Sequence, residues 1–69
     1  MASAWSPSQS FEFVASQNGN LGAHLGKIVG PQTAEEIRKE GDINKRAQRL
    51  QSLGLSPDQV KQLLMSLQQ

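Results

Sequence analysis

Apolar residues in the last third of the chain recur with the spacing of amphipathic helices. Four of them follow the i, i+3, i+4, i+7 rule of one helix face: Val60, Leu63, Leu64 and Leu67. Four earlier ones share the face of a preceding helix: Ile43, Ala47, Leu50 and Leu53. The pattern predicts two helices that pack against each other through their leucines, as an antiparallel or angled hairpin.

The residues between these two helices carry the signals of a tight corner. Gly54 stands where a helix C-terminus favours left-handed backbone, which glycine adopts without a steric penalty. Ser56 is placed as the next N-cap, Pro57 suits the first helical position, and Gln59 completes a capping box. We therefore expect one helix to end near Gly54 and the next to begin at Ser56.

A further short helix is expected after Pro31. Thr33 and Glu36 have the spacing of a second capping box. The pair Gly41-Asp42 then interrupts the pattern: it either ends a short helix, with Asp42 capping the next, or is a weak point in one long helix. We favour the break, so the predicted fold class is all-α, a small domain of two or three helices.

Residues 1–20 differ in composition from the rest of the chain. Serine and other small residues dominate the first ten positions, and we expect Pro7 to prevent a helix there. Phe11-Glu12-Phe13 alternates as a short extended segment does, and Asn18-Gly19 is a favourable turn dipeptide. The pattern predicts an extended or irregular N-terminal arm.

Residues 21–30 leave two interpretations open. Three apolar residues have helical spacing: Leu21, Leu25 and Ile28. The glycines among them oppose a helix, because each interior glycine costs about 1 kcal/mol relative to alanine. The alternative is the second strand of a hairpin that turns at Asn18-Gly19. We predict an arm with a Gly-rich segment over residues 1–30 and a helical mini-domain over residues 31–69.

Length and composition allow one small domain without covalent cross-links. The protein has 69 residues, no cysteine and a formal net charge of +1. A membrane-spanning helix needs about 18 consecutive apolar residues, and no apolar run of the sequence is nearly that long. The first fifteen residues also lack the basic and apolar regions of a secretory signal. We therefore expect a cytoplasmic or particle-associated protein that is not secreted and does not contact a membrane.

Two stretches are similar to ligand-binding motifs but lack residues that those motifs require. Gly22 and Gly26-Lys27 have three residues between the glycines where a phosphate-binding loop has four, and Ile28 replaces its magnesium-binding Ser or Thr. His24 is the sole histidine, so a single copy of the protein lacks the His and Cys ligands of a zinc site. We expect no catalytic residues, no enzymatic activity, no metal, no cofactor and no small-molecule substrate.

All three aromatic residues lie in the arm: Trp5, Phe11 and Phe13. In one interpretation the arm folds back and its aromatics complete a core that is too small alone. In the other they bind a partner, because Trp and Phe seated in pockets dominate interface energies. We expect a small non-catalytic interaction module, an accessory or structural subunit of a virion or other protein assembly, or one that self-associates, and we take these three residues as the partner-binding candidates.

The alternative function is nucleic-acid binding. Residues 46–63 resemble the helix-turn-helix family in the glycine and apolar residues of the turn, Leu53-Gly54-Leu55, and in two core positions after it, Val60 and Leu63. The segment departs from that family where Leu50 replaces a small residue and Arg49 takes a usually buried position. The recognition helix that this resemblance implies would face nucleic acid with Lys61 and Gln62, together with Ser56, Pro57 and Asp58. Separately, the basic cluster of Lys45, Arg46 and Arg49 is the candidate for contacts to a phosphate backbone. The low net charge favours this alternative less than the interaction module.

Overall fold

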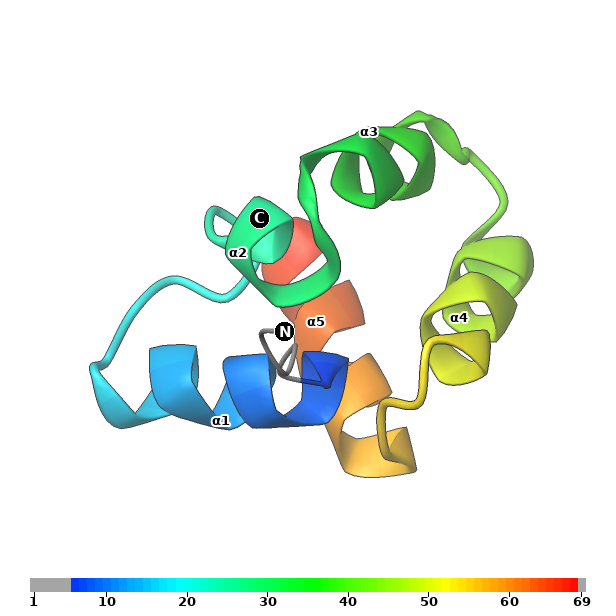
Figure 1. Ribbon diagram of the computed structural model, residues 1–69. Helices are drawn as coiled ribbons and strands as arrows, with labels where there is room; N and C mark the ends of the chain where they lie inside the picture. The colour runs from blue at the N-terminus through cyan, green and yellow to red at the C-terminus, as the bar shows by residue number, and fades with distance from the viewer. Residues whose placement is uncertain (1–5, 69) are drawn as a thin grey trace, which may run out of the picture.

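The structure, a computed structural model, describes residues 6–68. Within these residues every regular element is a helix, which confirms the predicted all-α class. The helices are α1 Pro7–Ser16, α2 Leu25–Val29, α3 Pro31–Lys39, α4 Ile43–Ser52 and α5 Pro57–Leu67. In Figure 1 α5 runs through the middle of the molecule, and the other four helices are arranged around it.

One hydrophobic core draws on all five helices. Its buried members are Phe11, Val14, Leu25, Ile28, Ala34, Ile37, Leu50, Leu55, Val60 and Leu63. The leucines predicted to join the last two helices are central to it, since Leu50 and Leu63 are completely buried. Residues from both the predicted arm and the predicted mini-domain therefore share this core. The division of the chain into units 1–30 and 31–69 stays a prediction.

The corner between α4 and α5 has the predicted geometry. Gly54 adopts φ +95°, the left-handed region that favours glycine. Ser56 caps α5: its hydroxyl accepts from the Gln59 backbone N–H, and the Gln59 side chain accepts from the Ser56 N–H. Leu55 and Val60 on either side of the cap are both buried, as a hydrophobic staple requires.

The predicted break before α4 is also confirmed, but α3 begins earlier than expected. Asp42 caps α4 by accepting hydrogen bonds from the next turn's backbone, from Asn44 N and Lys45 N. The N-cap of α3 is Gly30, at φ +93°, so the predicted Thr33 capping box does not form. The helix starts early because Pro31, whose fixed φ suits the first helical position, follows a glycine that can turn the backbone.

Helix α1 replaces the extended segment expected at Phe11-Glu12-Phe13, so that expectation is wrong. Ser6 is the N-cap, Pro7 occupies the first turn, and Gln9 closes a capping box with Ser6. Pro7 therefore starts a helix instead of preventing one. The motif Ser-Pro-x-Gln at residues 6–9 recurs at residues 56–59 and has the same role at both places.

The dipeptide Asn18-Gly19 ends α1 and does not form a hairpin turn. The Gly19 N–H donates to Val14 O and the Asn18 N–H to Ala15 O, both at 3.1 Å, which is the pattern of a Schellman motif. Asn18 takes the left-handed position with φ 57°. The backbone then turns into the short helix α2, so residues 25–29 follow the helical interpretation of the Gly-rich segment.

The aromatic residues of α1 offer a direct test of its place in the core. Phe11 is 2% exposed and Phe13 is 49% exposed. Phe11→Ala should lower the free energy of unfolding by about 3–5 kcal/mol, because it removes a large core side chain. The matched Phe13→Ala should cost less than about 1 kcal/mol, as surface substitutions do. Urea titration followed by circular dichroism measures both, and equal effects would contradict the assignment of Phe11 to the core.

Candidate functional site

Of the three predicted partner-binding residues the structure describes two, Phe11 and Phe13, and it gives them different surroundings. Phe11 is a core residue, while Phe13 lies largely exposed on α1. Trp5 lies outside the described residues. Within the described part of the chain two further large apolar side chains are exposed, Ile43 at the start of α4 and Met65 on α5.

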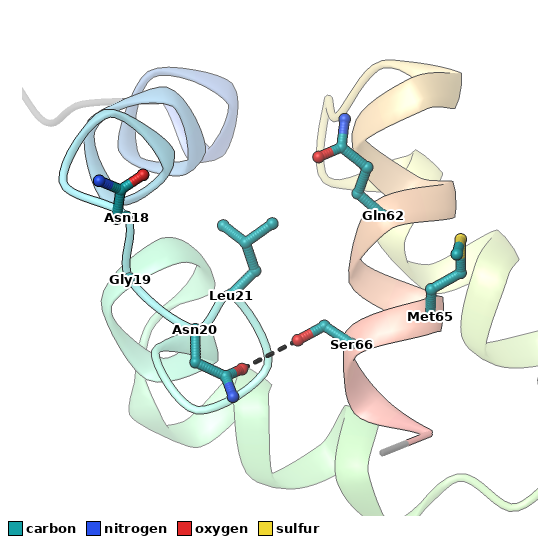
Figure 2. A pocket seen from close by; sticks show the side chains of 7 residues that line it. All are labelled: Asn18, Gly19, Asn20, Leu21, Gln62, Met65 and Ser66. Carbon is teal, nitrogen blue, oxygen red and sulfur yellow. Dashed lines mark hydrogen bonds between the residues drawn. The ribbon is translucent and has the colours of Figure 1, made fainter.

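A shallow hollow of about 420 Å³ lies between the loop after α1 and the C-terminal half of α5. We call it the α1–α5 groove, and its lining residues are Asn18, Gly19, Asn20, Leu21, Gln62, Met65 and Ser66. In Figure 2 Leu21 points into the space between the loop and α5, and Asn20 and Ser66 meet across it. The lining carries no formal charge, although 19% of the protein's residues are charged. It therefore suits an uncharged, partly apolar ligand surface.

The groove wall is fixed by a polar junction between α5 and the loop. The Ser66 hydroxyl accepts from the Gly22 backbone N–H at 2.7 Å and donates to Asn20 Oδ1 at 2.9 Å. From α3, the Arg38 guanidinium donates to Gly22 O at 2.9 Å. Gly22 thus has both backbone groups bonded to other elements, which sets the distance between the loop and α5.

Glycine is required at position 22 by this close approach. A Cβ atom there would lie 2.9 Å from Ser66 Oγ and 3.1 Å from the Ser66 carbonyl carbon and oxygen. The backbone atoms of a helix are held in place, unlike the far end of a flexible side group. In the sequence, Gly22 alone suggested a close approach of the backbone to another element. No local pattern indicated that the other element is Ser66 of α5, which is 44 positions away.

Gly22→Ala should therefore destabilise the protein by about 1–3 kcal/mol, because overpacking forces the loop away from α5. Gly41→Ala is the matched control, since a Cβ at Gly41 meets nothing within 4 Å; it should be neutral or stabilising by up to about 1 kcal/mol. Urea unfolding of the two variants measures the difference. Equal free energies of unfolding would show that the loop does not pack on α5 this closely.

The opposite end of α5 is joined to α1 by a buried amide. Gln59 is 5% exposed, and its Nε2 donates to Glu12 Oε2 at 3.0 Å and to Ser8 O at 3.4 Å. Its Oε1 accepts from the Ser56 N–H at 2.9 Å. The same amide thus caps α5 and holds α1 against the first turn of α5.

The residues predicted for nucleic-acid contact do not come together in one site. Lys45 and Arg49 border a hollow on α4 together with Glu40, Gln48 and Ser52. Gln62 lines the α1–α5 groove instead, and Lys61 is exposed on α5. Arg49 also lies next to an opposite charge, with its Nε 3.7 Å from Glu40 Oε1.

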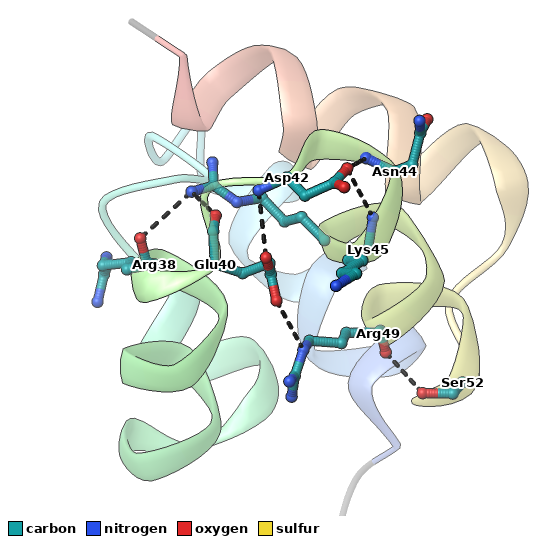
Figure 3. A network of polar contacts seen from close by, with 8 residues as sticks. Arg38, Glu40, Asp42, Asn44, Lys45, Arg49 and Ser52 are labelled. Carbon is teal, nitrogen blue, oxygen red and sulfur yellow. Dashed lines mark hydrogen bonds and ion pairs between the residues drawn. The ribbon is translucent and has the colours of Figure 1, made fainter.

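The Arg46 side chain makes hydrogen bonds within the fold, to backbone carbonyls at the end of α3. Its Nη2 donates to Glu40 O at 2.7 Å and to Arg38 O at 3.2 Å, the carbonyls at the end of α3. Figure 3 labels the accepting residues Arg38 and Glu40 and draws them beside the Asp42 cap of α4. The Nε atom is buried and has no hydrogen-bond partner among residues 6–68. The guanidinium therefore closes the C-terminus of α3 against α4.

Arg46→Gln should lower the free energy of unfolding by about 1–3 kcal/mol, because the carbonyls at the end of α3 lose a charged donor. Arg49→Gln removes the same charge from the same helix but only an exposed ion pair, so it should cost less than about 1 kcal/mol. Thermal and urea unfolding distinguish the two roles. Equal losses in both variants would contradict the structural role of Arg46.

Three groups with potential catalytic or ligating chemistry, those of His24, Glu12 and Asp42, have structural contacts. His24 Nδ1 lies 2.8 Å from Asn20 O, and because a carbonyl only accepts, the ring donates from Nδ1. Glu12 and Asp42 accept the hydrogen bonds described above. Within residues 6–68, no group of three or more His, Cys, Asp or Glu is arranged to hold a metal ion.

The comparisons with known proteins add no relative. No protein-family model matches the sequence, and neither the curated proteins nor the solved structures gave a significant match. Among the residues that the structure describes, no helix has the length and apolar character needed to cross a membrane.

The candidate contact residues are therefore the lining of the α1–α5 groove and exposed Phe13 of α1, which is not part of that lining. The sequence pointed to Phe13, through its aromatic character in a polar segment. It did not point to Leu21, Met65 or Ser66, because their proximity arises from the packing of α5 against a distant loop.

Proposed function

We propose that this protein is a small non-catalytic interaction module, an accessory or structural subunit that docks on a larger protein assembly through its N-terminal helix and the α1–α5 groove. The observation that carries the proposal is the exposure of Phe13. Phe11 and Val14 of the same helix are buried, whereas Phe13 is 49% exposed. Exposed aromatic side chains supply much of the binding energy at protein interfaces.

The chemistry of the groove supports the same function. Among residues 6–68, Met65 is the most exposed large apolar residue, at 58%, and both Met65 and Leu21 line the groove. Methionine adapts its flexible thioether to different partner surfaces. The amides of Asn18 and Gln62 at the rim offer both donors and acceptors. The lining thus combines apolar side chains with uncharged polar groups, and the centre of a protein interface is likewise depleted in charge.

The lining of the α1–α5 groove favours binding over catalysis. The α1–α5 groove is open to solvent, and its lining contains neither a carboxylate nor the histidine. A catalytic site would need a nucleophile or general base held near a second polar group. The residues of the groove instead offer contact area to a macromolecular partner.

The test compares partner capture by variants with matched exposed apolar residues. Wild-type protein, Phe13→Ser, Met65→Ser and Ile43→Ser are immobilised in equal amounts and exposed to an extract of cells that express the gene. A partner that docks as proposed is retained by wild type and Ile43→Ser, and at least about tenfold less by the other two, since losing one apolar anchor costs about 1.5–3 kcal/mol. Circular dichroism confirms that all variants remain folded.

Three results would contradict the proposal. Equal retention by all four proteins would exclude Phe13 and Met65 as contacts. Equal loss in all three variants would indicate a nonspecific apolar effect. Retention that disappears on nuclease treatment or moderate salt would instead support the nucleic-acid alternative. Sedimentation over a range of concentrations identifies the case in which the partner is a second copy of the protein.

A further inference from the structure

The end of α1 contains an unusually reactive pair of residues. Asn18 is exposed and is followed by Gly19, which has no side chain to shield its backbone nitrogen. That nitrogen donates a hydrogen bond to Val14 O at 3.1 Å as part of the Schellman motif. The same pair borders the α1–α5 groove.

We propose that Asn18 is a site of spontaneous deamidation whose rate is controlled by the C-terminal cap of α1. The Gly19 nitrogen loses its proton to solvent base and attacks Cγ of Asn18. A new bond from this nitrogen to Cγ closes a five-membered succinimide, and the bond from Cγ to Nδ2 breaks to release ammonia. Water then opens the ring at either carbonyl and leaves aspartate or isoaspartate at position 18. No oxidant, reductant or cofactor takes part.

The cap opposes this reaction through the hydrogen bond of the attacking atom. While Gly19 N–H donates to Val14 O, the nitrogen faces the helix end and is not free to attack Cγ of Asn18. The terminal turn of a helix opens more readily than the core, so the reaction reports local opening of this end. The deamidation rate in the folded protein should follow the stability of the α1 cap.

The other asparagines should react more slowly. Asn20 is followed by Leu21 and Asn44 by Lys45, whose side chains crowd the attacking nitrogen. Asn20 is held further, because its Oδ1 accepts from Ser66 Oγ and from the Ala23 N–H. These two residues are internal controls within the same molecule.

The product changes the charge of the groove. An amide that both donates and accepts becomes a carboxylate that only accepts, in a lining without formal charge. Isoaspartate also adds a backbone carbon, which is incompatible with the hydrogen-bond spacing of the cap. If docking occurs as in the proposed function, deamidation should weaken it, and this effect alone rests on that function.

The first experiment measures deamidation in the full-length protein at mildly alkaline pH, folded and in concentrated urea. Peptide mapping by mass spectrometry follows the gain of one mass unit at each asparagine. In urea Asn18 should react faster than Asn20 and Asn44. In the folded protein Asn18 should react at least about fivefold more slowly than in urea, the factor for one hydrogen bond of about 1 kcal/mol.

A pair of variants tests whether the cap sets the rate. Ala15→Gly weakens the end of α1, and Ala47→Gly makes the same change at a similarly packed position of α4. Ala15→Gly should raise the folded-state rate at Asn18 up to about fivefold, for about 1 kcal/mol of helix stability, while Ala47→Gly should change it less. Circular dichroism confirms that both variants are folded.

Equal rates at Asn18 in the folded and unfolded protein would overturn the control by the cap, as would equal rates in the two variants. Reaction at Asn20 or Asn44 as fast as at Asn18 in urea would overturn the assignment of the site. None of these measurements involves a partner, so they stand or fall separately from the proposed function. Asn18→Asp, compared with wild type in partner capture, tests the effect on docking alone.

Discussion

The side-chain amide of Gln59 is the polar contact that fixes how α1 lies relative to the start of α5. A buried amide costs free energy unless both its oxygen and its nitrogen are bonded. Here the oxygen completes the cap of α5 and the nitrogen binds α1. These hydrogen bonds of the Gln59 amide form at the same time only when α1 lies against the first turn of α5. A residue that local rules assign to a helix cap thus also fixes a tertiary contact between segments that are distant in the sequence.

Ser66 has the corresponding position at the other end of α5. It bonds the loop that follows α1, and Gly22 allows the loop to approach the helix backbone. Helix α5 is therefore attached to the N-terminal half by a polar contact at each end and by Val60 and Leu63 between them. Such a small domain lacks the core volume to be stable on a few leucines, and the buried Phe11 and Leu25 supply part of that volume.

The predictions from sequence succeeded where the signals were local. At the α4–α5 corner, neighbouring residues each favour the same geometry, so their preferences add. At α1 the same Ser-Pro-x-Gln motif was present, but the serine-rich composition and the alternation of Phe11 and Phe13 suggested an extended segment. Pro7 has two meanings, helix breaker or first helical residue, and only the capping residues around it decide between them.

The candidate site was less predictable because it depends on packing. Phe11 and Phe13 are the same residue type two positions apart, and only the orientation of α1 on the shared core determines that one is buried and the other exposed. Arg46 and Arg49 form a similar pair: both belong to one basic cluster in the sequence, yet the first binds the end of α3. The groove itself joins residues 18–21 to residues 62–66, and no local pattern indicates such a contact.

The central claim is that α1 belongs to the same cooperative core as α5. Native-state hydrogen exchange of the backbone amides tests it most directly, because it gives the opening free energy of each helix separately. The account predicts that the slowest amides of α1, near Phe11 and Val14, open with the same free energy as those near Leu63, within about 1 kcal/mol, and respond equally to added urea. Exchange of the whole of α1 at a much lower free energy, while α4 and α5 stay protected, would contradict it and would mean that α1 is a separately opening arm.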